Sequence, residues 1–166
     1  IAIFGQFLAI GIVYYYLNLP FPIIESYLII SLGLVTNLYL QFGVKINQLK
    51  DFYAAPFLLY DLIQLSALLY LTGGIFNPFS FLLVIPAIVS STFLSMGTTI
   101  ILGFITSILL FIISFFHLPL PGEEMNLLHF PNFYKVGIII SVLIGLIFLS
   151  YFGIRFAGEK KKTEEA

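Results

Sequence analysis

The sequence predicts an all-α membrane protein with six transmembrane helices and both termini in the cytoplasm. Of its 166 residues, 60% are hydrophobic and 9% are charged, a composition that a water-soluble globule cannot accommodate. Several apolar runs reach the length of about 20 residues that one helical crossing of a bilayer needs. These runs lack the alternation of a membrane β-barrel, and helices are the other structure that pairs every backbone polar group within lipid.

The six spans are separated by Pro, Gly and charged residues, which interrupt the apolar runs. The expected spans cover residues 1–19, 22–42, 54–72, 78–95, 98–116 and 134–156. Beyond the sixth span the sequence is rich in Lys and Glu and favours helix. We therefore expect a transmembrane domain at residues 1–157 and the start of a cytoplasmic linker at residues 158–166, although a short solvated tail would have the same composition.

The orientation follows from the seven basic residues, because cytoplasmic loops of membrane proteins carry an excess of Lys and Arg. Along a six-span chain, only Lys135 falls on one face, and the cytoplasmic face holds Lys45, Lys50, Arg155, Lys160, Lys161 and Lys162. The connection between the third and fourth spans should then lie outside. The loop that carries Glu123 and Glu124 should lie outside as well.

That connection holds the heptapeptide Gly-Gly-Ile-Phe-Asn-Pro-Phe at residues 73–79. Gly73 and Gly74 suit the end of a helix, where a residue without a Cβ adopts the left-handed conformation at little cost. Asn77 suits the N-cap of the next helix, and Pro78 suits its first position. The residue types alone are thus explained by a tight hairpin between two spans.

The same segment resembles a known family. Residues 61–92, DLIQLSALLYLTGGIFNPFSFLLVIPAIVSST, look like the third and fourth spans of the RegB/PrrB-type redox-sensing histidine kinases, whose quinone-binding motif is GGxxNPF. All fixed positions of the motif match. The segment from His117, HLPLPGEEMNLLHFPNFYKVG, is similar to the last outer loop of that family.

The resemblance implies a redox-sensing input domain in a bacterial inner membrane, with ubiquinone as the sensed ligand. It also implies a homodimer in the lipid bilayer and a cytoplasmic kinase core beyond Ala166 that signals to a response regulator. We expect no catalytic residue within these 166 residues, and the sequence shows no metal cluster and no nucleic-acid-binding patch.

A quinone ring is flat and apolar with a carbonyl acceptor at each end, so it needs apolar walls and one or two hydrogen-bond donors. Asn77 would supply a donor, and the two glycines would allow close approach to the backbone. A site built from donors should favour the quinone over the quinol. The implied quinone-binding residues are Gly73, Gly74, Asn77, Pro78 and Phe79, with Phe76 and Tyr70 as walls of the ring.

Polar side chains within the spans form a second candidate site. Asp61 lies about two turns inside the third span, with Gln64 one turn later, and Asn37 of the second span reaches a similar depth. We expect these residues to form an interhelical hydrogen-bond cluster, with Gln41 and Gln6 nearby. The cluster could hold the helices together or take part in proton-coupled signalling, and the sequence leaves both interpretations open.

Other features of the spans and loops have simpler explanations. Pro86 is expected to bend the fourth span. His117 and His129 bracket the last outer loop and suit an interfacial position better than haem ligation. Two other functions remain open: a quinone-reactive membrane anchor of a respiratory enzyme, which would need paired histidines within the spans, and a small transporter, which would need charged residues along a central path.

Overall fold

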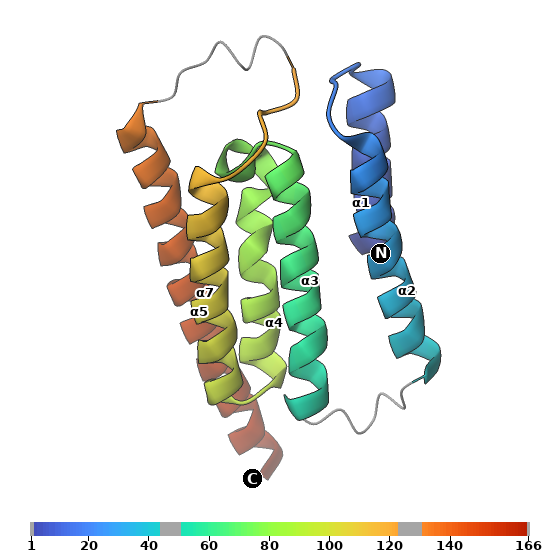
Figure 1. Cartoon of the computed structure of the whole chain (residues 1–166). Coiled ribbons are helices and arrows are strands. Elements are labelled where there is room, and N and C mark those ends of the chain that lie inside the picture. Colours follow the sequence, from blue (N-terminus) through green and yellow to red (C-terminus); the bar gives the residue numbers. More distant parts are fainter. Residues whose placement is uncertain (1, 44–50, 123–130, 166) are drawn as a thin grey trace.

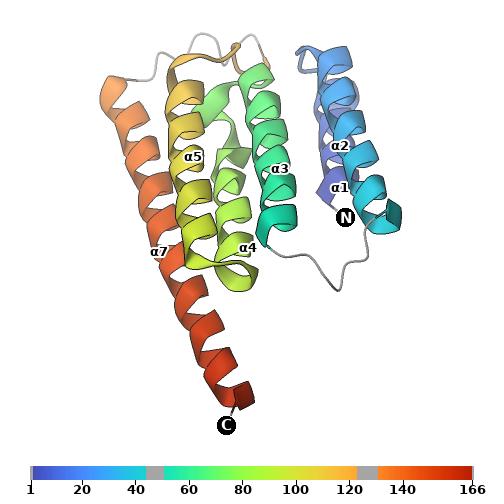
Figure 2. The same cartoon turned by 60° about the horizontal axis from the view of Figure 1, so that its bottom comes forward.

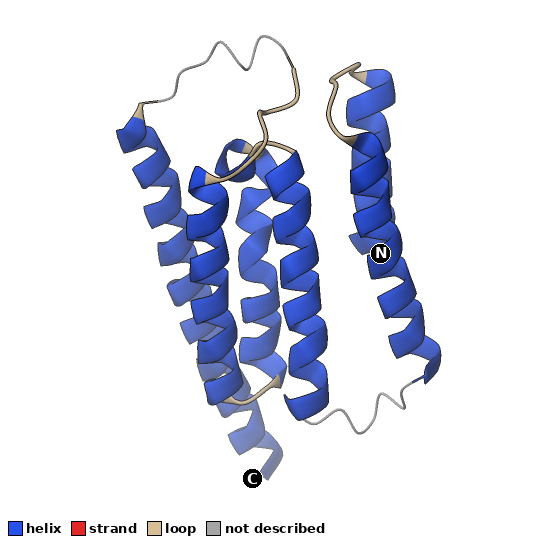
Figure 3. Ribbon diagram, viewed as in Figure 1, coloured by secondary structure: helices blue, strands red, loops and turns tan. Residues whose placement is uncertain are grey.

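The computed structural model describes residues 2–43, 51–122 and 131–165, which form helices joined by short turns, with no strand among them (Figures 1 and 3). The predicted all-α fold is confirmed. The α-helices are α1 (Ala2–Gly11), α2 (Ile23–Gly43), α3 (Asp51–Leu71), α4 (Ile85–Phe93), α5 (Met96–Phe115) and α7 (Asn132–Glu165). A π-helix, η1 (Ile12–Tyr16), continues α1, and two 3-10 helices, η3 (Gly74–Phe76) and η4 (Pro78–Val84), lie between α3 and α4.

Within the described residues, four helices are long and apolar enough to cross a membrane: Ile23–Leu40, Tyr53–Leu71, Met96–Phe115 and Asn132–Glu159. The first and fourth expected spans form shorter apolar helices, Ile3–Tyr16 and Pro78–Phe93. The number of six spans and the sides of the termini therefore stay predictions. The residues expected in loops at Lys45, Lys50, Glu123, Glu124 and His129 lie outside the described residues.

The fourth expected span differs from the bent α-helix that the sequence predicted. Its first part is the 3-10 helix η4, and the α-helical part begins at Ile85, with Pro86 in its first turn. Pro86 has no N–H and its ring would clash with a carbonyl one α-turn earlier, and Ile85 accordingly donates to the Leu82 carbonyl three residues back. A 3-10 helix rises about 2.0 Å per residue, so the seven residues of η4 and nine of α4 extend about 28 Å, close to the thickness of bilayer hydrocarbon.

The helices run alternately up and down, and α3, α4, α5 and α7 pack around one apolar core (Figures 1 and 2). The hairpin of α1 and α2 flanks this bundle on the α3 side in both views. The core consists of Leu62, Leu69, Ile75, Leu83, Val84, Ala87, Leu110, Ile113, Val142 and Leu146. One of these residues, Ile75, comes from the connection after α3, so the turn itself is anchored in the core.

Helix α7 is continuous for 34 residues and crosses the predicted boundary between residues 157 and 158 without a break. At 1.5 Å per residue it extends about 51 Å, and in Figure 2 it continues past the ends of its neighbours toward the C-terminus. Gly153 lets α7 lie directly against α4, since a Cβ there would overlap the side chain of Ser91. One rigid element thus links the end of the bundle near the 73–79 turn to the charged segment.

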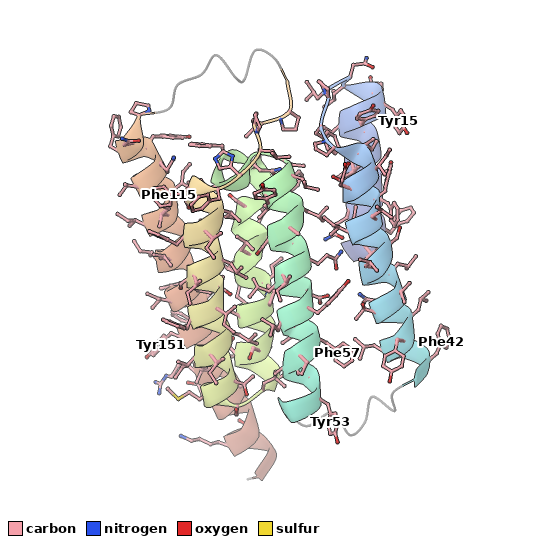
Figure 4. All side chains as sticks on the ribbon, viewed as in Figure 1. Tyr15, Phe42, Tyr53, Phe57, Phe115 and Tyr151 are labelled. Carbon is pink, nitrogen blue, oxygen red and sulfur yellow. The ribbon has the colours of Figure 1, made fainter. Side chains whose placement is uncertain are left out.

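Exposed aromatic side chains are found toward both ends of the molecule (Figure 4). Tyr15 and Phe115 lie toward the end that holds the 73–79 turn, and Phe42 and Tyr53 lie toward the opposite end. Each of the four has more than half of its surface exposed. This distribution fits the aromatic belts that mark the two interfaces of a bilayer.

Candidate functional site

The turn at residues 73–79 has the backbone that its glycines predicted. Gly73 has a φ of 106° and Gly74 a φ of 60°, both in the left-handed region that side chains with a Cβ rarely adopt. The chain therefore reverses directly after α3 and enters η3. Ile75 is 2% exposed and seats the turn in the core.

The side-chain amide of Asn77 holds this turn together, because its oxygen and its nitrogen both form hydrogen bonds within it. Its Oδ1 accepts a hydrogen bond from the Phe79 backbone N–H at 2.9 Å, which is the predicted N-cap, and Pro78 follows at the start of η4. Its Nδ2 donates to the Thr72 carbonyl at 3.1 Å and to the Thr72 hydroxyl at 2.7 Å. The amide hydrogens of Asn77 are thus used within the turn.

A second segment crosses over the turn: residues 117–120, which we call the strap, after the end of α5. The Leu118 N–H donates to the Tyr70 carbonyl at 2.8 Å and so pairs one of the carbonyls that the end of α3 leaves without a helical partner. The side chain of Leu120 occupies the space in which Gly73 would carry a Cβ. The strap, rather than a ligand, makes the close approach to the backbone of Gly73.

Gly74 is covered in the same way. A Cβ at Gly74 would meet the Ile113 carbonyl oxygen and would lie 2.6 Å from Cγ of the His117 ring. Both glycines are therefore required by space as well as by backbone conformation. This packing fixes the imidazole of His117 against the turn.

Four side chains meet where the strap begins, and we call them the Phe76 cluster: Phe76, Phe115, His117 and Lys135. The rings of Phe76 and His117 make an edge contact at 5.8 Å between centroids and 72° between planes. Lys135 Nζ, from the first turns of α7, lies 5.8 Å from the centroid of Phe76 and 5.3 Å from that of Phe115, both within the range of a cation–π interaction. The partial negative charge at the end of α5 also favours a cation at this place.

Aromatic surface around the turn is open to the surroundings. Phe115, at the end of α5 (Figure 4), is 54% exposed, Phe79 50% and Tyr70 43%. Phe76 is half-buried, with one contact to the strap and another to α7. The site thus combines exposed aromatic faces with one cation and one imidazole at the expected membrane edge.

The structure brings together only part of the predicted polar cluster within the spans. Gln64 Nε2 donates to Gln6 Oε1 at 3.2 Å, which links α3 to α1, and the amide of Gln64 fills the space beside Gly33 of α2. Asn37 instead donates to the Gly33 carbonyl of its own helix at 3.0 Å.

Asp61 does not join this contact and makes no hydrogen bond within the part of the chain that the structure describes. Three residues rotate an α-helix by about 300°, so Asp61 points about 60° away from Gln64. Its side chain is exposed, whereas that of Gln64 is buried. The side chain of Gln41 lies outside the described residues.

These features define a helical membrane domain with a tight turn, an aromatic surface and a cation at one end. The chain is 35% identical over 166 residues, 99% of its length, to the sensor histidine kinase RegB of Cereibacter sphaeroides. It spans 36% of the length of that relative. The resemblance to the RegB-type membrane sensor domain is therefore confirmed. No family model and no solved structure matches the chain.

Lys135 and Phe115 are residues of this site that the sequence analysis did not assign to it. Lys135 lies 59 positions after Phe76, and no local pattern indicates which ring it contacts. One signal was available, because Lys135 is the basic residue that falls on the predicted outer face while the others fall on the opposite one. A lone cation on that face, close to a span boundary, is a candidate for a specific contact.

Proposed function

We propose that this chain is the redox-sensing input domain of a two-component sensor histidine kinase, that it crosses the membrane six times with both termini in the cytoplasm, and that it binds ubiquinone beside the 73–79 turn. The observation that carries the proposal is the aromatic and cationic surface built onto a GGIFNPF turn in a chain 35% identical to a sensor kinase. The whole protein would act as a homodimer that controls autophosphorylation of a cytoplasmic kinase core and, through it, a response regulator.

The geometry supports a particular way of docking. The spaces beside Gly73 and Gly74 are filled by Leu120 and His117, so the ring would lie against the exposed aromatic faces rather than on the glycines. Phe76, Phe79 and Phe115 supply such faces, and the isoprenoid tail would remain in lipid. The motif residues would then act mainly by building the turn that presents these rings.

The contacts of α7 suggest how occupancy would reach the cytoplasm. Lys135 near the start of α7 contacts the ring of Phe76, and the helix continues without a break to Glu165. A bound quinone ring that displaces or strengthens the contact between Lys135 and Phe76 would move the start of α7, and α7 is one continuous helix. A differential interaction of about 1 kcal/mol between two states is enough to change their populations several-fold.

Photo-affinity labelling tests the proposal. The full-length protein in lipid vesicles would be irradiated with an azido-ubiquinone analogue, with and without excess ubiquinone-1, and the labelled peptides mapped. We expect competed labelling within residues 70–80 and at the end of α5 next to it. Competed labelling confined to other segments would overturn the proposed site.

A further inference from the structure

We propose that α7 has two registers against α4, three residues apart, and that the shift between them carries the signal out of the membrane domain. In the observed register, Gly153 faces Ser91. In the shifted register, Ser150 takes the place of Gly153, and its hydroxyl donates a hydrogen bond to Ser91 Oγ. The inference rests on the proposed function in one respect, namely that α7 is the element through which the domain signals.

The hydroxyl of Ser150 has no partner in the observed register. Its oxygen is buried, and within the part of the chain that the structure describes no hydrogen bond reaches it. Buried hydroxyls elsewhere in the bundle donate to the carbonyl four residues back, as those of Ser66, Thr106 and Ser114 do. An unpaired buried hydroxyl is unfavourable, so a conformation that gives Ser150 a partner gains free energy from this bond.

Ser91 offers an acceptor one helical turn away. Ser150 and Gly153 are three positions apart, so they lie about 60° apart around α7. Ser91 donates its own hydrogen to the Ile88 carbonyl at 2.6 Å, which leaves the lone pairs of its oxygen to accept. A screw movement of α7 by three residues, about 4.5 Å toward its C-terminus, brings Ser150 opposite Ser91.

The core face of α7 is compatible with this movement. Each residue of α7 moves into the place of the residue three positions later. Ile139 therefore takes the place of Val142 in the core, and Leu143 takes the place of Leu146. Both incoming side chains already pack against the core from its edge. Apolar side chains of similar size thus fill the core in either register, and such exchanges are well tolerated.

Opposing contacts keep the two registers close in free energy. The observed register has the closest approach of the helices at Gly153, and it has the contact of Lys135 with Phe76 at the start of α7. The shifted register loses both, because Ser150 brings a Cβ into the helix contact and Asn132 takes the place of Lys135. It gains the hydrogen bond between the two serines. Displacement of a packed helix by one turn between two discrete positions is a recognised form of allosteric switch.

Two alanine variants should shift the equilibrium in opposite directions. Ser150→Ala removes the hydrogen bond of the shifted register and should favour the observed one. Gly153→Ala adds a Cβ that overlaps Ser91 in the observed register. In the shifted register residue 153 moves to the present place of Phe156, which is 70% exposed and leaves room for a Cβ. Gly153→Ala should therefore favour the shifted register.

The same helix provides a matched control for each variant. Ser141→Ala repeats the serine substitution at an exposed position, where the hydroxyl donates to the Ile138 carbonyl. Gly145→Ala repeats the glycine substitution where nothing lies within 4 Å of a Cβ. Neither control changes a contact with α4, so neither should change the register.

Pulsed electron paramagnetic resonance measures the register directly. Spin labels at Met96→Cys, at the start of α5, and Thr163→Cys, near the end of α7, would be placed in the full-length protein in lipid nanodiscs. Any cysteine beyond residue 166 would be replaced by serine, and labelled chains would be diluted with unlabelled ones so that each pair lies within one chain. We expect a component about 3–5 Å longer in Gly153→Ala and the loss of this component in Ser150→Ala. The distance between labels at Phe42→Cys and Met96→Cys, which does not involve α7, should stay constant.

Autophosphorylation of the same proteins tests whether the register carries the signal. One net hydrogen bond changes the ratio of the two registers about fivefold, so the rate in Ser150→Ala should change by up to this factor. The rate in Gly153→Ala should change in the opposite direction, and the controls should match the unmodified protein.

Label distances that are the same in all variants would overturn the two registers. Rates that do not respond, or that change in the same direction in Ser150→Ala and Gly153→Ala, would overturn their role in signalling. Neither measurement uses a quinone. Failed photo-affinity labelling of residues 70–80 would therefore remove the proposed ligand site and leave the two registers of α7 standing.

Discussion

At the scale of single residues, the shape of the 73–79 turn depends on two glycines and on an asparagine side chain that forms hydrogen bonds within the turn. Gly73 and Gly74 have positive φ values and no room for a Cβ. Asn77 uses both ends of its amide for the turn. The identity of these residues is therefore explained by local structure, and the candidate ligand contacts come from the rings and charges held around it.

Replacing Gly74 by Ala should destabilise the protein by about 1–2 kcal/mol or more, because the left-handed backbone is unfavourable with a Cβ and the Ile113 carbonyl cannot move aside. Gly137→Ala in α7 is the control, since nothing lies within 4 Å of its Cβ. Thermal unfolding in detergent, followed by circular dichroism, measures both. Equal midpoints for the two variants would show that the Gly74 geometry is wrong.

Asn77→Ala should lower stability by about 1 kcal/mol through loss of the N-cap, and we expect a weaker redox response with membrane insertion intact. Asn77→Asp keeps an acceptor for the Phe79 N–H but cannot donate to the Thr72 carbonyl. Its stability should therefore lie between that of the unmodified protein and that of Asn77→Ala. Autophosphorylation of the reconstituted full-length variants, in oxidised and reduced ubiquinone-1, measures the response. An unchanged response in Asn77→Ala would exclude Asn77 from sensing.

The residue scale also shows what the sequence could predict. The left-handed glycines and the N-cap were predictable because their causes lie within a few positions of one another. The contacts of Phe76 with His117 and Lys135 join residues 41 and 59 positions apart, and their pairing depends on how α5 and α7 pack. Gln64 and Gln6 were predicted to lie near each other because they reach a similar depth in the membrane. Depth does not tell in which direction a side chain points from its helix, and Asp61 points away from both glutamines.

At the scale of elements, α7 is distinguished by its length and by its close packing on α4. Gly153 is the point of closest approach, because a Cβ would overlap Ser91 Oγ and lie 2.9 Å from Ser91 Cβ. Small residues at such crossings let membrane helices gain packing contacts that lipid does not replace. Any movement of α7 that carries a signal must therefore be accommodated at this contact.

Gly153→Ala should push α7 from α4, destabilise the bundle and change the basal kinase activity of the full-length protein. Gly145→Ala, on the same helix with nothing within 4 Å of its Cβ, should be neutral or stabilising by up to about 1 kcal/mol from helix propensity. For Gly153→Ala and Gly145→Ala, we would compare the midpoint of thermal unfolding in detergent and the rate of autophosphorylation of the full-length protein. A destabilised Gly145→Ala beside an unaffected Gly153→Ala would reverse the assignment of the contact.

At the scale of the whole molecule, the arrangement of the connections constrains the topology. The α1–α2 turn, the 73–79 turn and the strap lie at one end of the molecule, and the α4–α5 turn and the C-terminus lie at the other (Figure 1). The alternation of the helices is thus consistent with six crossings. The fourth expected span, Pro78–Phe93, fits this pattern because its first part, η4, is stretched as a 3-10 helix, which sequence length alone does not reveal.

The chain has no cysteine, so single cysteines can report which side of the membrane each end faces. Leu17→Cys and Pro131→Cys would lie at the end of the molecule that holds the 73–79 turn. Met96→Cys and Thr163→Cys would lie at the opposite end, and all four native residues are exposed. With six spans and cytoplasmic termini, an impermeant maleimide should label the first two in intact cells and the last two only after permeabilisation. Labelling of Leu17→Cys and Met96→Cys from the same side would exclude six crossings, because three spans lie between these positions and an odd number of crossings puts them on opposite faces.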